Sequence, residues 1–303
     1  MTSIELASTT LPAIVGFISL SRFERHDAIT SGSIELSPDI FGTGFLISED
    51  GLVATNRHVT EEFSKYPPHP QTSELGVAAI VQIRDRNEKG YGGGWQLIKI
   101  SHWHAVGSFS VDGVPVQIPE LIPDLAFVQL RVKRTPYLIF DSDEWSVRTG
   151  MNVATLGYPL GTFRASNGRI RQVSPYFRRG VVSSVFPFDV PKAQGFTIDI
   201  LQQGGSSRSP ILNEDGKVVG MMAASLLDSV SIQRADGTVV GCYAPQNTNI
   251  SICEGSTVLS KALAAYLELD RSDKSGFPEL KDLLGDSPNG ATHFSWDVFA
   301  KRG

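Results

Sequence analysis

Three polar residues lie beside apolar, strand-like segments, and their side chains could together activate a hydroxyl group as a nucleophile. His58 follows one apolar segment, Asp124 directly precedes another, and Ser207 lies in the Gly/Ser-rich segment 204–210 after a third. Taken singly, each is ordinary, because an Asp before a strand is usually a turn residue and a Gly/Ser run is usually a loop. A histidine after a strand is likewise most often a surface or packed residue. Only the combination of a histidine, an aspartate and a serine predicts nucleophilic chemistry.

A serine hydroxyl attacks a peptide carbonyl at neutral pH only when a base removes its proton. The base must be held in one tautomer by a carboxylate, and the developing oxyanion needs fixed N–H donors. The chain order His58, Asp124, Ser207 is that of a known solution to this problem, in which the three residues lie on loops of a two-barrel β fold.

The elements that would position these residues are predicted by the remaining pattern. Short segments rich in Val, Ile, Phe and Leu recur along most of the chain, and Gly, Asp, Asn or Pro separates nearly all of them, as in the predicted turns at 49–51 and 213–216. This pattern indicates antiparallel β-structure. The one long helical period is Val258–Leu269, with Ser256 as its expected N-cap, and a short helix is predicted at 278–284.

We therefore predict an all-β fold of two antiparallel six-stranded β-barrels, followed by a C-terminal helix. The two barrels would form one unit over residues 1–255, with the N-terminal barrel at about 10–135 and the C-terminal barrel at about 145–255. Residues 256–303 would form the helix and a tail that is too short to be an independent domain.

Composition excludes several classes of function. The chain of 303 residues has 27 Lys+Arg against 32 Asp+Glu and a net charge of −5, so a nucleic-acid or membrane-surface partner is not expected. The apolar run 11–20 is too short to span a bilayer and reads poorly as a secretory signal. Two cysteines cannot provide a disulfide framework, which favours a cytoplasmic location.

Six segments carry a family resemblance, in this order along the chain: Gly42-Thr-Gly-Phe-Leu-Ile-Ser48, Thr55-Asn-Arg-His-Val59, Pro123-Asp-Leu-Ala-Phe-Val128, Leu156-Gly-Tyr-Pro-Leu-Gly161, Gly180-Val-Val-Ser-Ser184 and Thr197-Ile-Asp-Ile200. Over roughly residues 10 to 255 the sequence resembles trypsin-like (chymotrypsin-fold) serine proteases, most closely the Deg/HtrA type. The resemblance implies a cofactor-independent serine endopeptidase with a polypeptide substrate and no metal. Many Deg/HtrA relatives carry a peptide-binding PDZ domain after the protease, whereas only the helix and tail follow here.

The resemblance selects among three candidate nucleophiles. Ser206, Ser207 and Ser209 compete, and the family pattern of Gly-x-Ser followed by two residues and Pro fits only if Ser207 is the nucleophile. His58 is then the general base and Asp124 its orienting carboxylate. The backbone N–H groups of Gly205, Ser206 and Ser207 would line the oxyanion hole. Ser206 and the following arginine, Arg208, depart from the usual family residues.

Specificity and regulation are implied only through this resemblance. The primary pocket would be shaped by Leu201, Ala223, Ala224 and Ser225, and because none of these is a carboxylate, an apolar residue before the scissile bond is expected.

Arg208, Arg178 and Arg179 are candidate regulatory residues, the last two in a basic stretch that corresponds to the family's activation loop. The alternative is that each of these arginines simply points into solvent from a loop and has no regulatory role.

Two other functions remain open from the sequence. The chain could be a protease-fold module that binds peptides or partners without catalysis, or a protease that is latent until a protein partner activates it. The oligomeric state is not predicted. His102 and His104 would share one strand face, but two histidines alone make a poor metal site.

Overall fold

A computed structural model describes residues 1–20, 40–68, 75–87, 90–106, 109–111, 114–116, 123–158, 175–200, 209–233 and 239–283. Within these ranges, side chains are described except at 83–87, 90–95, 109–111, 114–116, 227–233 and 239–247.

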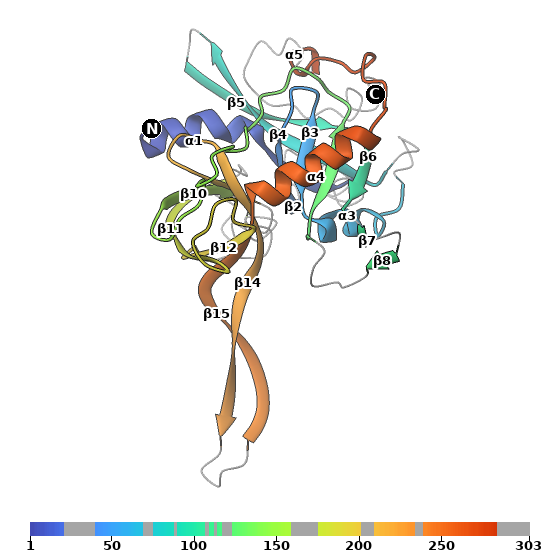
Figure 1. Cartoon of the computed structure of the whole chain (residues 1–303). Coiled ribbons are helices and arrows are strands. Elements are labelled where there is room, and N and C mark those ends of the chain that lie inside the picture. Colours follow the sequence, from blue (N-terminus) through green and yellow to red (C-terminus); the bar gives the residue numbers. More distant parts are fainter. Residues whose placement is uncertain are drawn as a thin grey trace, which may run out of the picture.

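The N-terminal half is a seven-stranded, largely antiparallel sheet that curls into a half-barrel (Figure 1). Its strands are β1 (Ile14–Ser19), β2 (Ile40–Leu46), β3 (Leu52–Thr55), β4 (Val77–Asn87), β5 (Gly90–Ile98), β6 (Ile100–Ala105) and β9 (Ala126–Leu130). They are ordered β5-β4-β1-β2-β3-β9-β6. β7 (Phe109–Val111) and β8 (Val114–Val116) form a separate two-stranded sheet.

The C-terminal half is a closed barrel of six antiparallel strands in the order β10-β11-β12-β15-β14-β13. The strands are β10 (Asn152–Gly157), β11 (Tyr176–Phe186), β12 (Gly195–Ile198), β13 (Pro210–Leu212), β14 (Val218–Gln233) and β15 (Val239–Gly255). The predicted trypsin-like double barrel is thus confirmed. In detail, the N-terminal half has seven strands rather than six, and its edge strands β5 and β6 do not pair with each other in the described residues.

Five short helical elements complete the described chain. They are α1 (Ser3–Thr10), the 3-10 turn η1 (Leu11–Ala13), α3 (Arg57–Phe63), α4 (Ser256–Leu269) and α5 (Leu280–Leu283). α4 confirms the predicted C-terminal helix, but its N-cap is Gly255 and not Ser256. The Ser256 hydroxyl instead lies 3.3 Å from the carbonyl oxygen of Asp141, to which it donates.

Turn glycines appear where the sequence pattern requires them. Gly51, between β2 and β3, has φ of 78°, and Gly216, between β13 and β14, has φ of 80°. Glycine adopts this left-handed backbone without the steric penalty that a Cβ brings, so both positions fix tight connections between neighbouring strands. The predicted turns at 49–51 and 213–216 are therefore confirmed.

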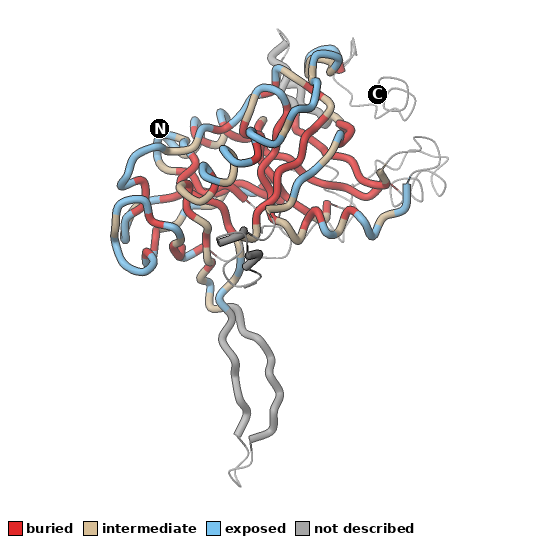
Figure 2. Tube along the Cα trace, turned by 45° about the vertical axis from the view of Figure 1, so that its right-hand side comes forward, coloured by how far each residue is buried: buried red, intermediate tan, exposed pale blue. Residues whose placement is uncertain are grey.

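Two hydrophobic clusters stabilise the fold. Figure 2 shows that buried residues run through both halves of the body. The larger fills the N-terminal sheet and continues across the junction to residues of the C-terminal half such as Leu156 and Met221. The smaller, which includes Phe196 and Ile211, fills the closed barrel. Because the larger cluster contains residues of both halves, burial of apolar area holds the halves together.

Helix α1 joins the N-terminal sheet to the closed barrel. It begins with a capping box in which Thr2 and Glu5 satisfy each other's backbone N–H groups. Its Leu6 is 1% exposed, belongs to the larger core and lies next to Gly216. Ser3 accepts a hydrogen bond of 3.0 Å from the Arg179 guanidinium on β11.

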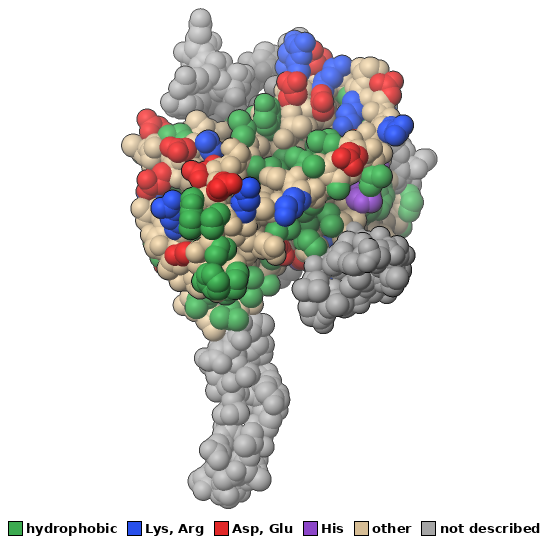
Figure 3. Space-filling model, in the orientation of Figure 1, with side chains coloured by type: hydrophobic (Ala, Val, Ile, Leu, Met, Phe, Trp, Pro, Cys, Tyr) green, Lys and Arg blue, Asp and Glu red, His purple; other side chains and the backbone are tan. Residues whose placement is uncertain are grey.

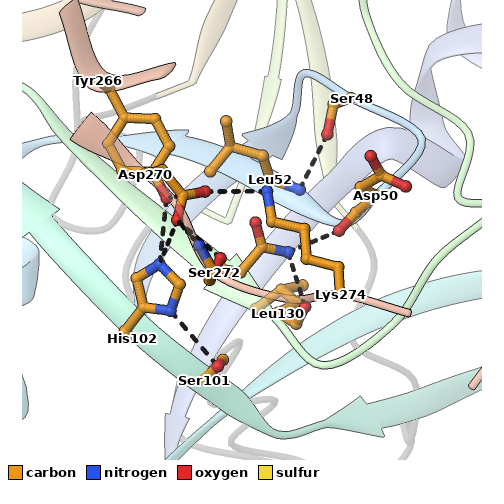
Figure 4. A network of polar contacts seen from close by, with 11 residues as sticks. Ser48, Asp50, Leu52, Ser101, His102, Leu130, Tyr266, Asp270, Ser272 and Lys274 are labelled. Carbon is orange, nitrogen blue, oxygen red and sulfur yellow. Dashed lines mark hydrogen bonds and ion pairs between the residues drawn. The ribbon is translucent and has the colours of Figure 1, made fainter. Parts of the chain in front are cut away.

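A polar network fixes the C-terminal helix to the N-terminal sheet (Figure 4). The Tyr266 hydroxyl at the end of α4 lies 3.2 Å from His102 Nε2 on β6 and donates to Asp270 Oδ2 over 3.2 Å. Asp270 also accepts from the Ser272 backbone and hydroxyl and pairs with Lys274 Nζ at 2.9 Å. Burial alone would raise the pKa of Asp270, but the hydrogen bonds from Ser272 and Lys274 outweigh it and hold the pKa well below its usual range.

We expect Asp270→Asn to lower the free energy of unfolding at pH 7 by about 2 kcal/mol, because hydrogen bonds to a charged group are lost. The pKa of Asp270 is lowered on folding, so its contribution is complete above the unfolded value of 3.8 and is lost as the pH falls through the folded value. Urea unfolding at pH 7 and at pH 2.5 measures this, and the gap between variant and wild type should shrink at the lower pH.

The matched control is Asp273→Asn, which removes the same charge from an exposed side chain. It should change the free energy of unfolding by less than about 0.5 kcal/mol. An Asp270→Asn effect that is equal at both pH values would show that the carboxylate charge does not stabilise α4.

Candidate active site

His58 lies where β3 ends and α3 begins. β3 stops at Thr55, Asn56 takes the N-cap position, and His58 is the second residue of the helix. The change from extended to helical backbone turns the imidazole out of the sheet, and its side chain is 41% exposed. The predicted position of His58 at the end of an apolar strand is confirmed, although the helix after it was not expected.

Asp124 lies at the same edge of the sheet because of strand pairing. β3 and β9 are antiparallel neighbours, with Thr55 opposite Ala126, so the residues after β3 and before β9 meet. The Leu125 N–H donates back to the Pro123 carbonyl over 2.8 Å, which makes a tight three-residue turn centred on Asp124.

Three N–H groups converge on the Asp124 carboxylate. His58 Nδ1 lies 2.5 Å from Oδ2, the His58 backbone N–H donates to Oδ1 over 3.2 Å, and Asn56 Nδ2 donates to Oδ2 over 2.8 Å. The backbone N–H belongs to the first turn of α3, where it has no partner within the helix. With the proton held on Nδ1, the Nε2 lone pair of His58 is left to accept a proton, as a general base requires.

The same contacts keep Asp124 ionised. Burial raises the pKa of this carboxyl, but the hydrogen bonds from His58 and Asn56 outweigh the burial and lower its pKa to about 2. A negative charge therefore lies beside the imidazole of His58 at neutral pH.

Asn56 is a site residue that the sequence analysis did not single out. A carboxylate only accepts hydrogen bonds, so the amide must turn its NH2 group toward Asp124. Asn56 is fully buried, and its Oδ1 atom then has no partner among the described residues. An unpaired buried acceptor lowers the stability of the folded state. The arrangement therefore holds Asp124 in place at some expense of local stability. Nothing in the local sequence marks this role.

The charge of Asp124 also acts on a second carboxyl, that of Glu254 on β15. Burial, and to a smaller extent the negative charge of Asp124, raise the pKa of Glu254. The interaction brings a residue of the C-terminal barrel under the influence of the His58–Asp124 pair. It could not be predicted from the sequence, because it depends on how the two halves meet.

A chain of contacts leads from this pair across the junction to the C-terminal barrel. Thr55 donates to the Thr43 carbonyl over 2.8 Å, and the Thr43 hydroxyl accepts from the Tyr158 N–H over 3.0 Å. Next to Tyr158, Gly157 packs so closely on Ser209 that an added Cβ would lie 1.8 Å from the Ser209 Oγ.

Ser209 is 1% exposed, so its hydroxyl is buried in this junction and not presented to a substrate. Ser207, Gly205, Ser206, Arg208 and Leu201 lie outside the described residues.

The remaining predicted site residues have defined places. Ala223, Ala224 and Ser225 follow the point at which β13 stops pairing with β14, and all three are at least partly exposed. Arg179 contacts Ser3 of α1 and lies 3.7 Å from Glu214, so it joins α1 to the barrel. Arg178, on the same strand, is half-buried opposite Thr155.

His102 belongs to the Tyr266–Asp270 network, away from the His58–Asp124 pair. Among the residues that the structure describes, no group of three or more His, Cys, Asp or Glu side chains could hold a metal ion. In the same part of the chain, no helix is long and apolar enough to cross a membrane.

Comparisons with known proteins agree with this geometry. The family model described as a trypsin-like peptidase domain matches residues 42–221. Serine protease Do-like HtrA of Bacillus subtilis is 25% identical over 281 residues, which cover 88% of this chain and 51% of that protein. Serine protease HTRA1 of Xenopus laevis is 23% identical over 83% of this chain and 45% of that protein. The chain thus spans about half the length of these curated relatives.

A solved structure shows a similar fold. The HtrA-type protease AlgW with a decapeptide matches with a TM-score of 0.50 and 16% identity, covering 88% of this chain and 68% of that one.

We expect Asn56→Ala to raise the pKa of Asp124 from about 2 by roughly one unit, because one of the hydrogen bonds that favours the ionised carboxyl is removed. The pH titration of the Asp124 carboxyl carbon by NMR measures this. Asn152→Ala is the matched control, since Asn152 donates to the exposed Glu214, and it should leave Asp124 unchanged. An unchanged pKa in Asn56→Ala would mean that the amide does not bind Asp124 in solution.

Proposed function

The chain belongs to the trypsin-like peptidase domain family, and we propose that it is a serine endopeptidase in which Ser207, His58 and Asp124 form the catalytic triad. The observation that carries the proposal is the His58–Asp124 pair, with Nδ1 held 2.5 Å from an ionised carboxylate at the edge of the sheet. This arrangement leaves Nε2 of His58 available to a nucleophilic hydroxyl. Local stability alone does not explain it, because the buried Asn56 Oδ1 atom has no partner among the described residues.

Two observations support Ser207 over its neighbours as the nucleophile. Ser209 is buried against Gly157, and its carbonyl accepts from the Met222 N–H, so this residue is part of the barrel wall. Ser207 completes the Gly205-x-Ser207 pattern, in which Gly205, Ser206 and Ser207 would supply the oxyanion-hole N–H groups.

In the proposed reaction, His58 Nε2 takes the proton of Ser207 Oγ as this oxygen attacks the substrate carbonyl carbon. The tetrahedral oxyanion collapses, the C–N bond breaks, and His58 returns the proton to the leaving amine. Water then attacks the acyl-enzyme ester, with His58 accepting its proton and passing it to Ser207 as the acid product leaves. Asp124 stays ionised throughout and stabilises the imidazolium.

The proposed substrate is a polypeptide with an apolar residue before the scissile bond. The AlgW structures were solved with a decapeptide and with tripeptides, which supports a peptide substrate for a similar fold. The small residues Ala223, Ala224 and Ser225 offer no carboxylate to a basic side chain. The proposal includes a cytoplasmic location, which the free, buried thiol of Cys253 supports.

Labelling with a fluorophosphonate probe tests the triad. We expect an adduct on Ser207, mapped by mass spectrometry, that is lost in Ser207→Ala and retained in the matched variant Ser209→Ala. Asp124→Asn should slow the labelling by roughly 10³–10⁴-fold, because the imidazole loses its orienting partner. If folded wild-type protein is not labelled, the chain is not a constitutively active protease. A latent protease and a peptide-binding module would then be separated by adding candidate protein partners.

Peptide hydrolysis tests the pocket. We expect kcat/KM for a substrate with Leu before the scissile bond to exceed that for the same peptide with Arg by at least tenfold, since burying an unpaired charge is costly. A preference for Arg would contradict the assignment of Ala223–Ser225 to the pocket.

A further inference from the structure

Glu254 is a half-buried carboxyl on β15, close to the end of the last strand of the closed barrel. Side chains on a strand alternate between the two faces of the sheet. The preceding residue, Cys253, is 1% exposed and packs in the hydrophobic cluster that fills the barrel. Glu254 therefore projects from the outer surface of the barrel.

The strand pairing shows what this outer surface faces. Glu254 lies directly opposite Met221 of β14, and residues that are directly opposite share one face of a sheet. Met221 is fully buried and belongs to the larger hydrophobic cluster, which continues into the N-terminal sheet. Glu254 thus lies at the junction with the half of the protein that carries His58 and Asp124.

The charge that Glu254 meets at this junction is negative. Its neighbour on β12 is Gly195, which has no side chain. In the described ranges, the titratable groups that interact with the Glu254 carboxyl are Asp124 and the Cys253 thiol. Burial keeps the pKa of that thiol well above its ordinary value, so the thiol is uncharged at neutral pH. The charge that acts on Glu254 is therefore that of Asp124.

An interaction free energy between two sites acts equally on both of them. The Asp124 charge opposes the ionisation of Glu254, so an ionised Glu254 makes the electrostatic potential at Asp124 more negative. The His58 ring shares this environment, because its Nδ1 lies 2.5 Å from Asp124 Oδ2. A more negative potential favours the protonated form of an imidazole.

We propose that Glu254 adjusts the catalytic base from the C-terminal barrel: its carboxylate, acting through Asp124, increases the affinity of His58 for a proton. Because it acts through another residue, Glu254 is a positioning residue and not a catalytic one. The inference rests on the proposed function, since it concerns the base of that reaction. It makes the junction between the halves a determinant of the pH range of hydrolysis.

The effect has a defined sign. Burial, and to a smaller extent the Asp124 charge, raise the pKa of Glu254 above its ordinary value of 4.5, and its charge is gained as the pH rises through the raised value. The charge then makes His58 a stronger base, so His58 loses its proton at a higher pH. Removal of the Glu254 charge should let His58 act as a base at lower pH.

NMR titration of the His58 ring in full-length Ser207→Ala protein tests the proposal without hydrolysis. We expect Glu254→Gln to lower the titration midpoint of His58 by about 0.3–0.7 unit, a roughly two- to fivefold loss of proton affinity, as for charges separated by partly hydrated protein. Glu254→Asp keeps the charge and should restore at least half of the difference. An unchanged midpoint in Glu254→Gln would overturn the proposal.

Glu268→Gln is the matched control, because it removes the same charge from an exposed position on α4. Figure 3 shows acidic and basic side chains interspersed over the face that carries α4, where salt and water screen them. The His58 midpoint should change by less than about 0.1 unit in this variant. Equal changes in the two variants would assign the effect to the net charge of the protein and overturn the proposal.

The reverse measurement does not need a Glu254 variant. In Ser207→Ala protein, Asp124→Asn should lower the titration midpoint of the Glu254 carboxyl carbon by about 0.3 unit or more, because the neighbouring negative charge is removed. A midpoint of Glu254 that does not respond would show that the two carboxyls are not coupled, and the proposal would fail.

Peptide hydrolysis separates this proposal from the proposed function. In active protein, Glu254→Gln should move the acid limb of the pH profile of kcat/KM to lower pH by the same amount, about 0.3–0.7 unit, since this limb reports the base of the free enzyme. An acid limb that does not move would contradict the proposal. If wild-type protein hydrolyses no peptide, the proposed function fails, whereas the two NMR titrations still decide whether Glu254 acts on His58.

Discussion

The carboxylate of Asp124 is the charged group on which the N-terminal half of the site depends. It receives hydrogen bonds from the His58 ring, the His58 backbone and the Asn56 amide. Because the donors belong to the start of α3 and the acceptor precedes β9, the same bonds attach the helix to the sheet and fix the tautomer of the base. A single ionised group thus links the fold of this region to its chemistry.

The junction between the two halves constrains where the C-terminal barrel lies relative to His58. The shared hydrophobic core and the contacts Thr55–Thr43–Tyr158 set the C-terminal barrel against the sheet edge that carries His58. Barrel closure leaves no free edges among six strands, yet β14 and β15 outgrow the barrel and expose edges again.

Much of this arrangement could be predicted from the sequence, for identifiable reasons. Turn residues at 49–51 and 213–216 marked the strand boundaries, and the apolar stripe of 258–269 marked α4. α1 and α3 were missed because each has only two turns, too few to show a helical period. The role of Asn56 depends on a partner 68 residues away, and the length of the paired strands β14 and β15 depends on a register that alternation alone does not specify.

The contacts of α1 have a consequence for biosynthesis. Ser3 is bound by Arg179, 176 residues later in the chain, and Leu6 packs beside Gly216. At translation rates of 5–20 residues per second, the segment that becomes α1 waits roughly 9–35 s for its docking surface to be made. During that interval its apolar face is a natural target for chaperones. The first helix to be synthesised can therefore complete its contacts only after β11 and the turn between β13 and β14 have been made.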